Sequence, residues 1–218
     1  MAAKDPLLAR NWTKTRVLDC LEKEQRVEIA RFLDDRYRER FFDPIRYLKK
    51  AQGNESGYGF AIMALCCLMI ETIESYRQGL PSTSKDDMEA LEKLPANGTA
   101  GEYSLQPPFK NCNGKVFEEF FKCDSHKKFF PDVPGKSFYL NIRCGLLHQA
   151  QTKGGWLIGR KGKYCDEGPP GSINRDEFSE RLEECFHEYL KELAAEQNWD
   201  GPIWKPTRMK VYWLAQSS

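Results

Sequence analysis

The segment RCGLLH contains an arginine and a histidine that are separated by four residues, Arg143 and His148. These residue types suit the cleavage of RNA without a metal. A neutral imidazole can take the proton of a ribose 2′-hydroxyl, and an imidazolium can protonate the leaving 5′-oxygen, because histidine titrates near neutral pH. A guanidinium can pair with two phosphate oxygens and stabilise the charge of the pentacovalent transition state. The pair therefore predicts an acid/base histidine beside a phosphate-binding arginine.

The surrounding residues 137–151, SFYLNIRCGLLHQAQ, predict a helix that ends before Gly154 and Gly155. On such a helix the two side chains project about 140° apart, since each residue turns by about 100°. A single helix therefore needs a groove, or a second subunit, to bring the target between them. Two copies of the helix facing each other across a twofold axis would place two arginines and two histidines around one cleft.

Three polar residues are predicted to support this pair. Asn141, Cys144, His148 and Gln151 follow the three-to-four spacing of one helix face, so Asn141 and Gln151 are expected to hydrogen-bond the same substrate. The third residue is Glu71, on another predicted helix.

A carboxylate on a buried helix requires a partner, and Glu71 or Glu74 is expected to orient Arg143 by a charge-assisted hydrogen bond. The sequence alone leaves the choice between the two open.

Positive charge is concentrated around the motif. Between Asp132 and Asp166 there is no acidic residue, whereas the rest of the chain holds 27 basic against 32 acidic residues. Local positive potential attracts phosphate backbones, and Trp156 and Tyr164 are candidates for stacking on bases, although aromatic residues of a hairpin more often pack inward. The basic residues of this stretch are Lys136, Arg143, Lys153, Arg160, Lys161 and Lys163, of which Lys153, Arg160, Lys161 and Lys163 are predicted to bind RNA.

Several helices are predicted to position the motif. Apolar residues recur at helical spacing over residues 13–40. Asp43 and Pro44 are typical of a capped helix start, which predicts a chain reversal near Asp43. The apolar run 58–79 predicts a central buried helix rather than a membrane span, because Glu71 interrupts it.

The remaining segments complete an all-α bundle. Residues 80–113 are rich in Pro, Ser and Gly and predict a long surface insertion containing one short helix. Helices are expected over 114–130 and in a long segment capped by Asn174. KGGWLIGRKGKYC predicts a small β-hairpin or a loop after the motif helix. The tail 198–218 is expected to pack on the bundle, with a short strand at MKVYWLA.

Length and composition exclude several classes of protein. The 218 residues suit one domain spanning 1–218, and a hydrophobic fraction of 40% with a net charge of +1 is typical of a soluble globular chain. These values argue against collagen-like, disordered or nucleic-acid-coating proteins.

The eight cysteines lack short repeated spacings, and the N-terminus lacks a secretory signal, which predicts reduced thiols in a cytoplasmic protein. Cys112, Cys123 and His126 form too loose a cluster for structural zinc, so no metal and no cofactor is expected. His126 and His187 are interpreted as ordinary surface residues.

A helical bundle with an R-x4-H motif on a late helix resembles the HEPN superfamily, over roughly residues 15–200. The segment IRCGLLHQAQTKGGW is also similar to a group of bacterial HEPN-like proteins. Many members are metal-independent ribonucleases of toxin–antitoxin and antiviral defence systems. In them the motif's arginine and histidine form a composite site at a dimer interface. The resemblance therefore implies these roles for Arg143 and His148 in a homodimer that cleaves single-stranded RNA, with an antitoxin or regulatory protein as a further partner.

Two positions depart from the family pattern. Cys144 stands where the family often has Asn, and Ala150 stands where one subgroup has a Tyr, so regulation by modification of that Tyr is not expected. Two other readings remain open. The chain could be a non-catalytic helical module that binds a nucleotide, RNA or a protein, or a purely structural scaffold in which Arg143 and His148 only satisfy buried polar groups.

Overall fold

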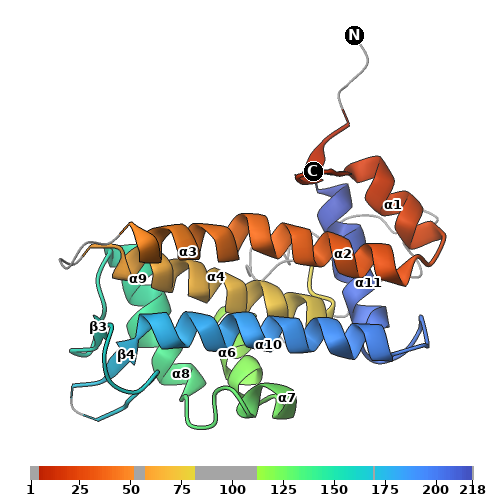
Figure 1. Ribbon diagram of the computed structural model, residues 1–218. Helices are drawn as coiled ribbons and strands as arrows, with labels where there is room; N and C mark the ends of the chain where they lie inside the picture. Colours follow the sequence, from red (N-terminus) through yellow and green to blue (C-terminus); the bar gives the residue numbers. More distant parts are fainter. Residues whose placement is uncertain (1–4, 52–56, 82–111, 169, 218) are drawn as a thin grey trace. The chain divides into compact units, whose positions relative to one another are not determined.

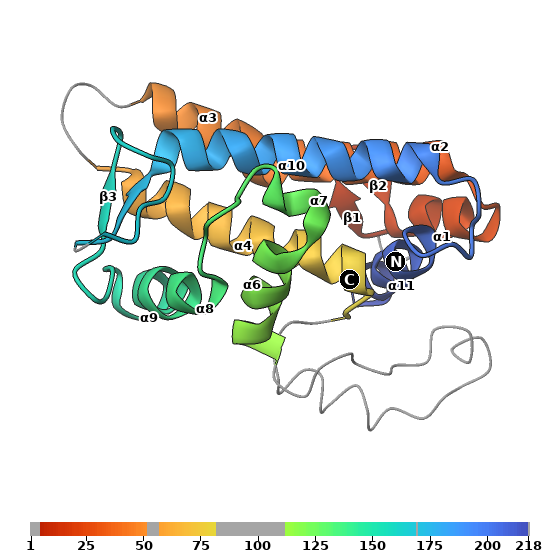
Figure 2. The same ribbon diagram turned by 90° about the horizontal axis from the view of Figure 1, so that it is seen from below.

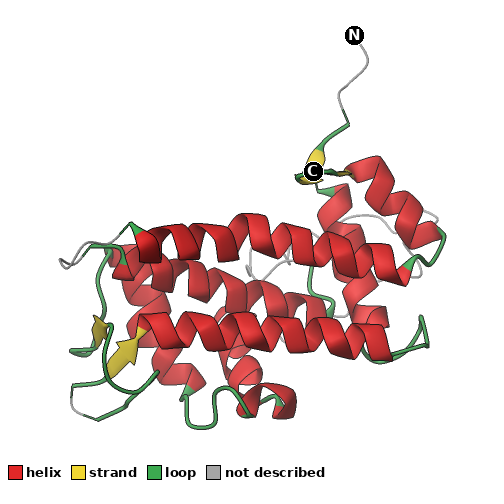
Figure 3. Ribbon diagram, in the orientation of Figure 1, coloured by secondary structure: helices red, strands yellow, loops and turns green. Residues whose placement is uncertain are grey.

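The computed structural model describes residues 5–51, 57–81, 112–168 and 170–217, so most of the predicted insertion at 80–113, with its short helix, lies outside the described residues. The structure is 66% helical and 7% strand, which confirms the all-α class. Its contacts divide it into two compact units, one of residues 1–36, 73–116 and 190–218 and one of residues 37–72 and 117–189. Figure 3 shows how helices dominate both.

The first unit contains two short antiparallel strands, β1 (Leu7–Ala9) and β2 (Trp12–Thr13), and the helices α1 (Lys14–Glu22) and α11 (Trp204–Gln216). It also holds α2 (Arg26–Tyr37) up to residue 36, and the C-terminal turns of α4 (Gly59–Gln78) and α10 (Arg175–Ala195). Thr13 caps α1, since its side chain accepts a hydrogen bond from the Arg16 amide at 3.3 Å.

The tail of the chain is helical, and the predicted strand at MKVYWLA is wrong. These residues belong to α11, which packs on α1 and buries one face at three-to-four spacing. The indole N–H of Trp204 is shared between the carbonyls of Leu193 and Glu196, at 2.9 and 3.1 Å, which ties the start of α11 to the end of α10. The buried face consists of Trp204, Thr207, Arg208, Val211 and Ala215.

One lysine of α11 is mostly buried and has no acidic partner in the described part of the chain. Lys210 Nζ donates to the Pro81 carbonyl at 2.8 Å, and burial, with a smaller contribution from Arg36, lowers the pKa of Lys210 to about 8. Burying a charge costs stability unless an opposite charge compensates it. Lys210 therefore stabilises the fold best when it is neutral.

Replacing this lysine is expected to stabilise the protein. Between pH 8 and the ordinary lysine pKa of 10.5 the unfolded chain binds more protons than the folded one, so the unfolding free energy should rise with pH. Lys210→Met should remove that rise and add roughly 1–2 kcal/mol at pH 7. Chemical denaturation of the wild type and the variant at pH 7 and pH 10 measures the unfolding free energies. An equal rise of the unfolding free energy with pH in both proteins would contradict this role of Lys210.

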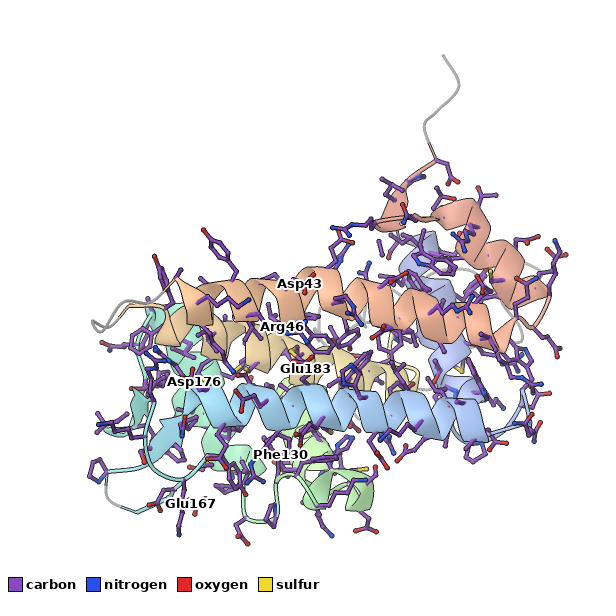
Figure 4. The ribbon with its side chains drawn as sticks, viewed as in Figure 1. Asp43, Arg46, Phe130, Glu167, Asp176 and Glu183 are labelled. Carbon is purple, nitrogen blue, oxygen red and sulfur yellow. The ribbon has the colours of Figure 1, made fainter. Side chains whose placement is uncertain are left out.

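The second unit is built on α3 (Asp43–Lys50), residues 59–72 of α4 (Gly59–Gln78) and residues 175–189 of α10 (Arg175–Ala195). In this unit Figure 1 shows the three helices side by side. Arg46 bridges Asp43 on its own helix and Glu183 on α10, as Figure 4 shows. Lys49 of α3 pairs with Glu180 of α10 at 3.1 Å. These ion pairs hold α3 against α10.

The helix does not restart at Asp43, and the predicted chain reversal there is wrong. A π-helical turn, Arg38–Phe42, joins α2 to α3, and Phe42 and Asp43 both keep helical dihedral angles. The Asp43 amide donates to the Arg38 carbonyl, five residues back. This turn loosens the hydrogen-bond ladder just ahead of Pro44, which has no N–H to donate, so the chain continues as a helix.

Aromatic side chains fill the core of the second unit. Tyr37 stacks on Phe186 with ring centroids 3.9 Å apart, and Phe138 stacks on Phe178 at 5.3 Å. Phe130, labelled in Figure 4, lies 5.0 Å from Phe178. The helices of the second unit also include α7 (Asp124–Lys127), α8 (Gly135–Phe138) and residues 117–122 of α6 (Cys112–Lys122). They belong to a short segment rich in aromatic residues that packs against α10.

The segment after the motif helix forms strands, but not a hairpin. β3 (Leu157–Gly159) pairs in parallel with β4 (Ser172–Asn174), so the loop between them crosses over before α10 begins. The predicted β-hairpin is therefore wrong. Trp156 is buried, and its ring lies so close to Gly171 that a Cβ there would come within 2.6 Å of it.

The central helix α4 is long and apolar enough to cross a membrane by length and composition. However, 67% of its most apolar window is buried inside the structure, as in the core helix of a soluble protein. This agrees with the sequence prediction of a buried helix, which ends at Gly79 with a φ of +67°.

Candidate functional site

Arg143 is held in place by Glu71 within the second unit. Its Nε donates to Glu71 Oε1 at 2.7 Å, and the two side chains are only 15% and 8% exposed. Glu71 comes from α4, and Arg143 is the last residue of a π-helical turn, Tyr139–Arg143. The structure thus answers which carboxylate orients the arginine: it is Glu71.

The motif helix is one helical run over residues 135–149 with a wide turn in its middle. It consists of α8, the π turn and α9 (Cys144–Gln149), and Figure 2 shows it beside α4. The Cys144 amide donates to the Tyr139 carbonyl, five residues back. Such turns occur often at functional sites, and this one sets the position from which Arg143 reaches α4.

The two terminal nitrogens of Arg143 have no hydrogen-bond partner among the described residues, and neither is fully buried. Burial disfavours the cation, but the hydrogen bond and charge of Glu71 outweigh this and raise the pKa of Arg143. The guanidinium is therefore permanently charged, anchored through Nε, and left with a free edge. Such an edge is what bidentate binding of a phosphate requires.

Tyr139 and Cys67 adjoin this pair without acting as bases. The guanidinium of Arg143 lies 5.8 Å from the centre of the Tyr139 ring. Burial, and then a hydrogen bond with Cys144, raises the pKa of Tyr139 to about 12, and burial raises the pKa of Cys67 well above its ordinary value. Both groups stay protonated at neutral pH. Sequence reasoning missed Tyr139, although its spacing of four from Arg143 was a usable signal.

His148 lies on α9 with an exposed side chain and no hydrogen bond to any described residue. It follows Arg143 by five residues of helix, so the two side chains diverge, as the sequence predicts. One chain therefore exposes His148, keeps Arg143 mostly buried, and does not bring the two side chains together by helix geometry.

Asn141 and Gln151 do not share one helix face with His148, and that expectation is wrong. The π turn shifts Asn141, whose Nδ2 donates to Ser137 Oγ at 3.1 Å. The helix ends at Gln149, and Ala150 adopts a left-handed conformation with a φ of +53°. Gln151 thus follows the helix in an exposed segment that folds back.

Gly145 permits that fold back. A Cβ at this position would lie 2.4 Å from the Gln151 carbonyl oxygen, closer than any real contact. The segment after the helix therefore packs directly on the backbone of the motif.

Gly145→Ala should destabilise the protein by about 1–3 kcal/mol through this overpacking. The sign of this change in unfolding free energy is informative, because Gly→Ala inside a helix otherwise stabilises a protein by about 1 kcal/mol. Denaturant unfolding measures the change. Gly159→Ala, where the nearest atom is 4.0 Å away, is the control and should differ little from the wild type. Equal stability of the Gly145→Ala variant and the wild type would contradict the close approach.

The predicted RNA-binding cations differ in their availability. Arg160 Nε donates to Asp176 Oδ2 at 3.0 Å, so an acidic residue from α10 offsets one charge. Lys153, Lys161 and Lys163 pair with no acidic residue in the described ranges. Trp156 and Tyr164 pack inward, Trp156 at 7% exposure and Tyr164 against Phe130 and Arg181. The surface thus offers charge rather than stacking.

The interpretation of His126 as a surface residue is wrong. It is buried, and its Nδ1 contacts the Phe120 carbonyl at 2.9 Å. Because a carbonyl only accepts, Nδ1 carries the proton and satisfies one of the last carbonyls of α6. His187 is partly exposed, with its ring 5.6 Å from that of Phe42.

Within the described residues no group of three or more His, Cys, Asp or Glu side chains could hold a metal ion. The comparisons with known proteins give no match: no protein-family model, no curated protein and no solved structure is significantly similar to this chain. The function must therefore be argued from the site itself.

Proposed function

We propose that the protein is a metal-independent endoribonuclease of the HEPN type, acting in a defence or toxin-type system in the cytoplasm. The observation that carries this proposal is the anchored Arg143, which offers two free guanidinium nitrogens five residues before an exposed His148. Three unpaired lysines on the following segment, Lys153, Lys161 and Lys163, would attract the RNA backbone.

In the proposed reaction the 2′-hydroxyl oxygen attacks the adjacent phosphorus while the bond to the 5′-oxygen breaks. The imidazole of one His148 takes the 2′-hydroxyl proton, and an imidazolium protonates the leaving 5′-oxygen. Arg143 binds the phosphate oxygens as negative charge builds up on them. The products are a 2′,3′-cyclic phosphate and a 5′-hydroxyl, and the balance requires no water and no metal.

A second copy of the chain would complete the site, because Arg143 and His148 diverge on one helix. Leu147 follows Arg143 by four residues of helix, and Leu68 precedes Glu71 by three, so both leucines neighbour the ion pair. They are 39% and 40% exposed. Apolar side chains around a half-site are what a symmetric partner would cover.

Leu147→Asp should therefore turn the dimer into a monomer and abolish cleavage, since a charge would be buried at the interface. Leu157→Asp, at a more exposed leucine of β3, is the matched control and should leave the oligomeric state and the RNA cleavage unchanged. Analytical ultracentrifugation and RNA cleavage by the same samples measure this. A wild-type protein that is monomeric at all concentrations would overturn the composite site.

The direct test of function is cleavage of single-stranded RNA by purified protein in the presence of a chelator. The proposal expects cleavage that leaves cyclic phosphate ends. Binding of RNA without cleavage would instead favour the non-catalytic module, in which the same cations hold RNA or a nucleotide.

A further inference from the structure

Two exposed aromatic rings stand at the start of α4, in the second unit. Tyr58 and Phe60 are 43% and 44% exposed, and neither ring contacts another ring or a cation among the described residues. The Tyr58 carbonyl accepts the Ile62 amide at 2.9 Å, so the first turn of the helix fixes the backbone that carries both rings. Two neighbouring rings exposed on a rigid helix start form a surface that a partner can use.

The residue between the two rings packs against the strand that leads into a basic loop. A Cβ at Gly59 would lie 3.1 Å from the Ile158 side chain of β3 and 2.5 Å from the guanidinium of Arg175. β3 continues directly into residues 160–163, RKGK, which are called the basic loop below. Figure 1 shows β3 and the start of α4 at the same end of this unit.

The start of α10 joins the rings to the basic loop. The Asn174 side-chain amide donates to the Gly162 carbonyl at 3.1 Å, and the Asn174 backbone amide donates to the Lys163 carbonyl at 3.3 Å. The next residue, Arg175, is the one that Gly59 approaches. The aromatic start of α4 and the basic loop are therefore fixed to two consecutive residues.

The chemistry of the two features is complementary. Lys161 and Lys163 pair with no acidic residue in the described ranges, whereas the aromatic residues nearest to the loop in sequence, Trp156 and Tyr164, pack inward. Exposed cations beside exposed rings are the combination that binds single-stranded nucleic acids, because the cations follow the phosphates and the rings stack on the bases. The bases of a duplex already stack on one another and offer no free face.

We propose that Tyr58 and Phe60 form a platform on which bases of single-stranded RNA stack, beside phosphates held by the basic loop. This inference rests on the proposed ribonuclease function and assigns where its substrate is held outside the reacting phosphate. Phe60 precedes Glu71 by three turns on the same face of α4, about 16 Å along the helix axis. The platform therefore holds bases a few nucleotides away from the phosphate that Arg143 binds.

Fluorescence anisotropy with a labelled 2′-O-methyl RNA of about twelve nucleotides tests the platform. This probe has no free 2′-hydroxyl, so binding is measured separately from cleavage. Phe60→Ala and Tyr58→Ala should each weaken binding at least about fivefold, the lower value for the loss of one stacked base. The dependence of log Kd on log salt concentration should stay as in the wild type, whereas Lys161→Gln should reduce that slope by about 0.7.

Two conservative variants separate stacking from apolar contact. Phe60→Leu keeps an exposed apolar side chain without a ring and should lose nearly as much affinity as Phe60→Ala. Tyr58→Phe keeps the ring and should bind as the wild type does, since the Tyr58 hydroxyl bonds no described residue.

Three results would overturn the platform: no binding of the probe by the wild type, wild-type affinity of both alanine variants, or wild-type affinity of Phe60→Leu. A loss of affinity that comes with dissociation into monomers, measured by analytical ultracentrifugation, would assign the rings to an interface between copies and would also overturn it. Absence of RNA cleavage by a wild type that gives the expected binding results would refute the ribonuclease alone and leave the platform to the non-catalytic module.

Discussion

His148→Ala should reduce RNA cleavage by about 10²–10⁴-fold, the usual contribution of a general acid or base. The side chain is exposed and makes no hydrogen bond within the described residues, so its removal should leave stability within about 0.5 kcal/mol of the wild type. Loss of activity without loss of stability would identify a chemical role. Initial cleavage rates and thermal unfolding of the same preparation measure both quantities.

His187→Ala is the matched control for this variant. His187 is a partly exposed histidine of the same unit. It lies on α10, packs beside Phe42 and is not part of the motif. It should retain cleavage at nearly the wild-type rate. Equal losses in both histidine variants would show that the effect is not specific to His148 and would contradict its role.

Glu71→Ala should destabilise the protein by about 2–4 kcal/mol, because it leaves the mostly buried cation of Arg143 without its partner. Glu71→Ala combined with Arg143→Met should recover at least about 1 kcal/mol of this loss, since the double variant has no unpaired charge. Denaturant unfolding of the wild type, both single variants and the double variant gives the coupling free energy directly.

The exposed pair of Lys127 and Asp124 provides the comparison. Its side chains are 53% and 95% exposed, so water screens the pair and Asp124→Ala should leave the unfolding free energy nearly unchanged. The Glu71→Ala variant should also lose RNA cleavage, because Arg143 is misoriented. The double variant should remain inactive although part of its stability is recovered. If the loss of unfolding free energy in the double variant equals the sum of the losses in the Glu71→Ala and Arg143→Met variants, the anchoring role of Glu71 is contradicted.

The long helices could be predicted from sequence because their signals are local. The apolar run of α4 and the capped, amphipathic pattern of α10 fix both elements within a few residues. The sequence could also single out Arg143, His148 and Glu71, because the type of each side chain indicates the chemistry that it can perform. What the sequence left open was which carboxylate Arg143 meets, because that depends on how α4 packs against the motif helix.

The errors arise where tertiary contacts override local signals. Asp43 and Pro44 look like a helix start, but a π turn absorbs the proline within a continuing helix. The second π turn, before Cys144, removes Asn141 from the predicted face. His126 lies among lysines in sequence, yet its ring satisfies a carbonyl in an aromatic core. None of these outcomes follows from propensity or periodicity alone.

The central claim is that this motif cleaves RNA by attack of the 2′-hydroxyl. Its most direct test is an RNA cut at one identified position, compared with the same RNA carrying a single 2′-deoxynucleotide at that position, in chelator. The wild-type protein should leave a 2′,3′-cyclic phosphate on the first RNA and should not cut the second at that position. Cleavage there that persists in the 2′-deoxy RNA, or in the His148→Ala protein, would contradict the mechanism.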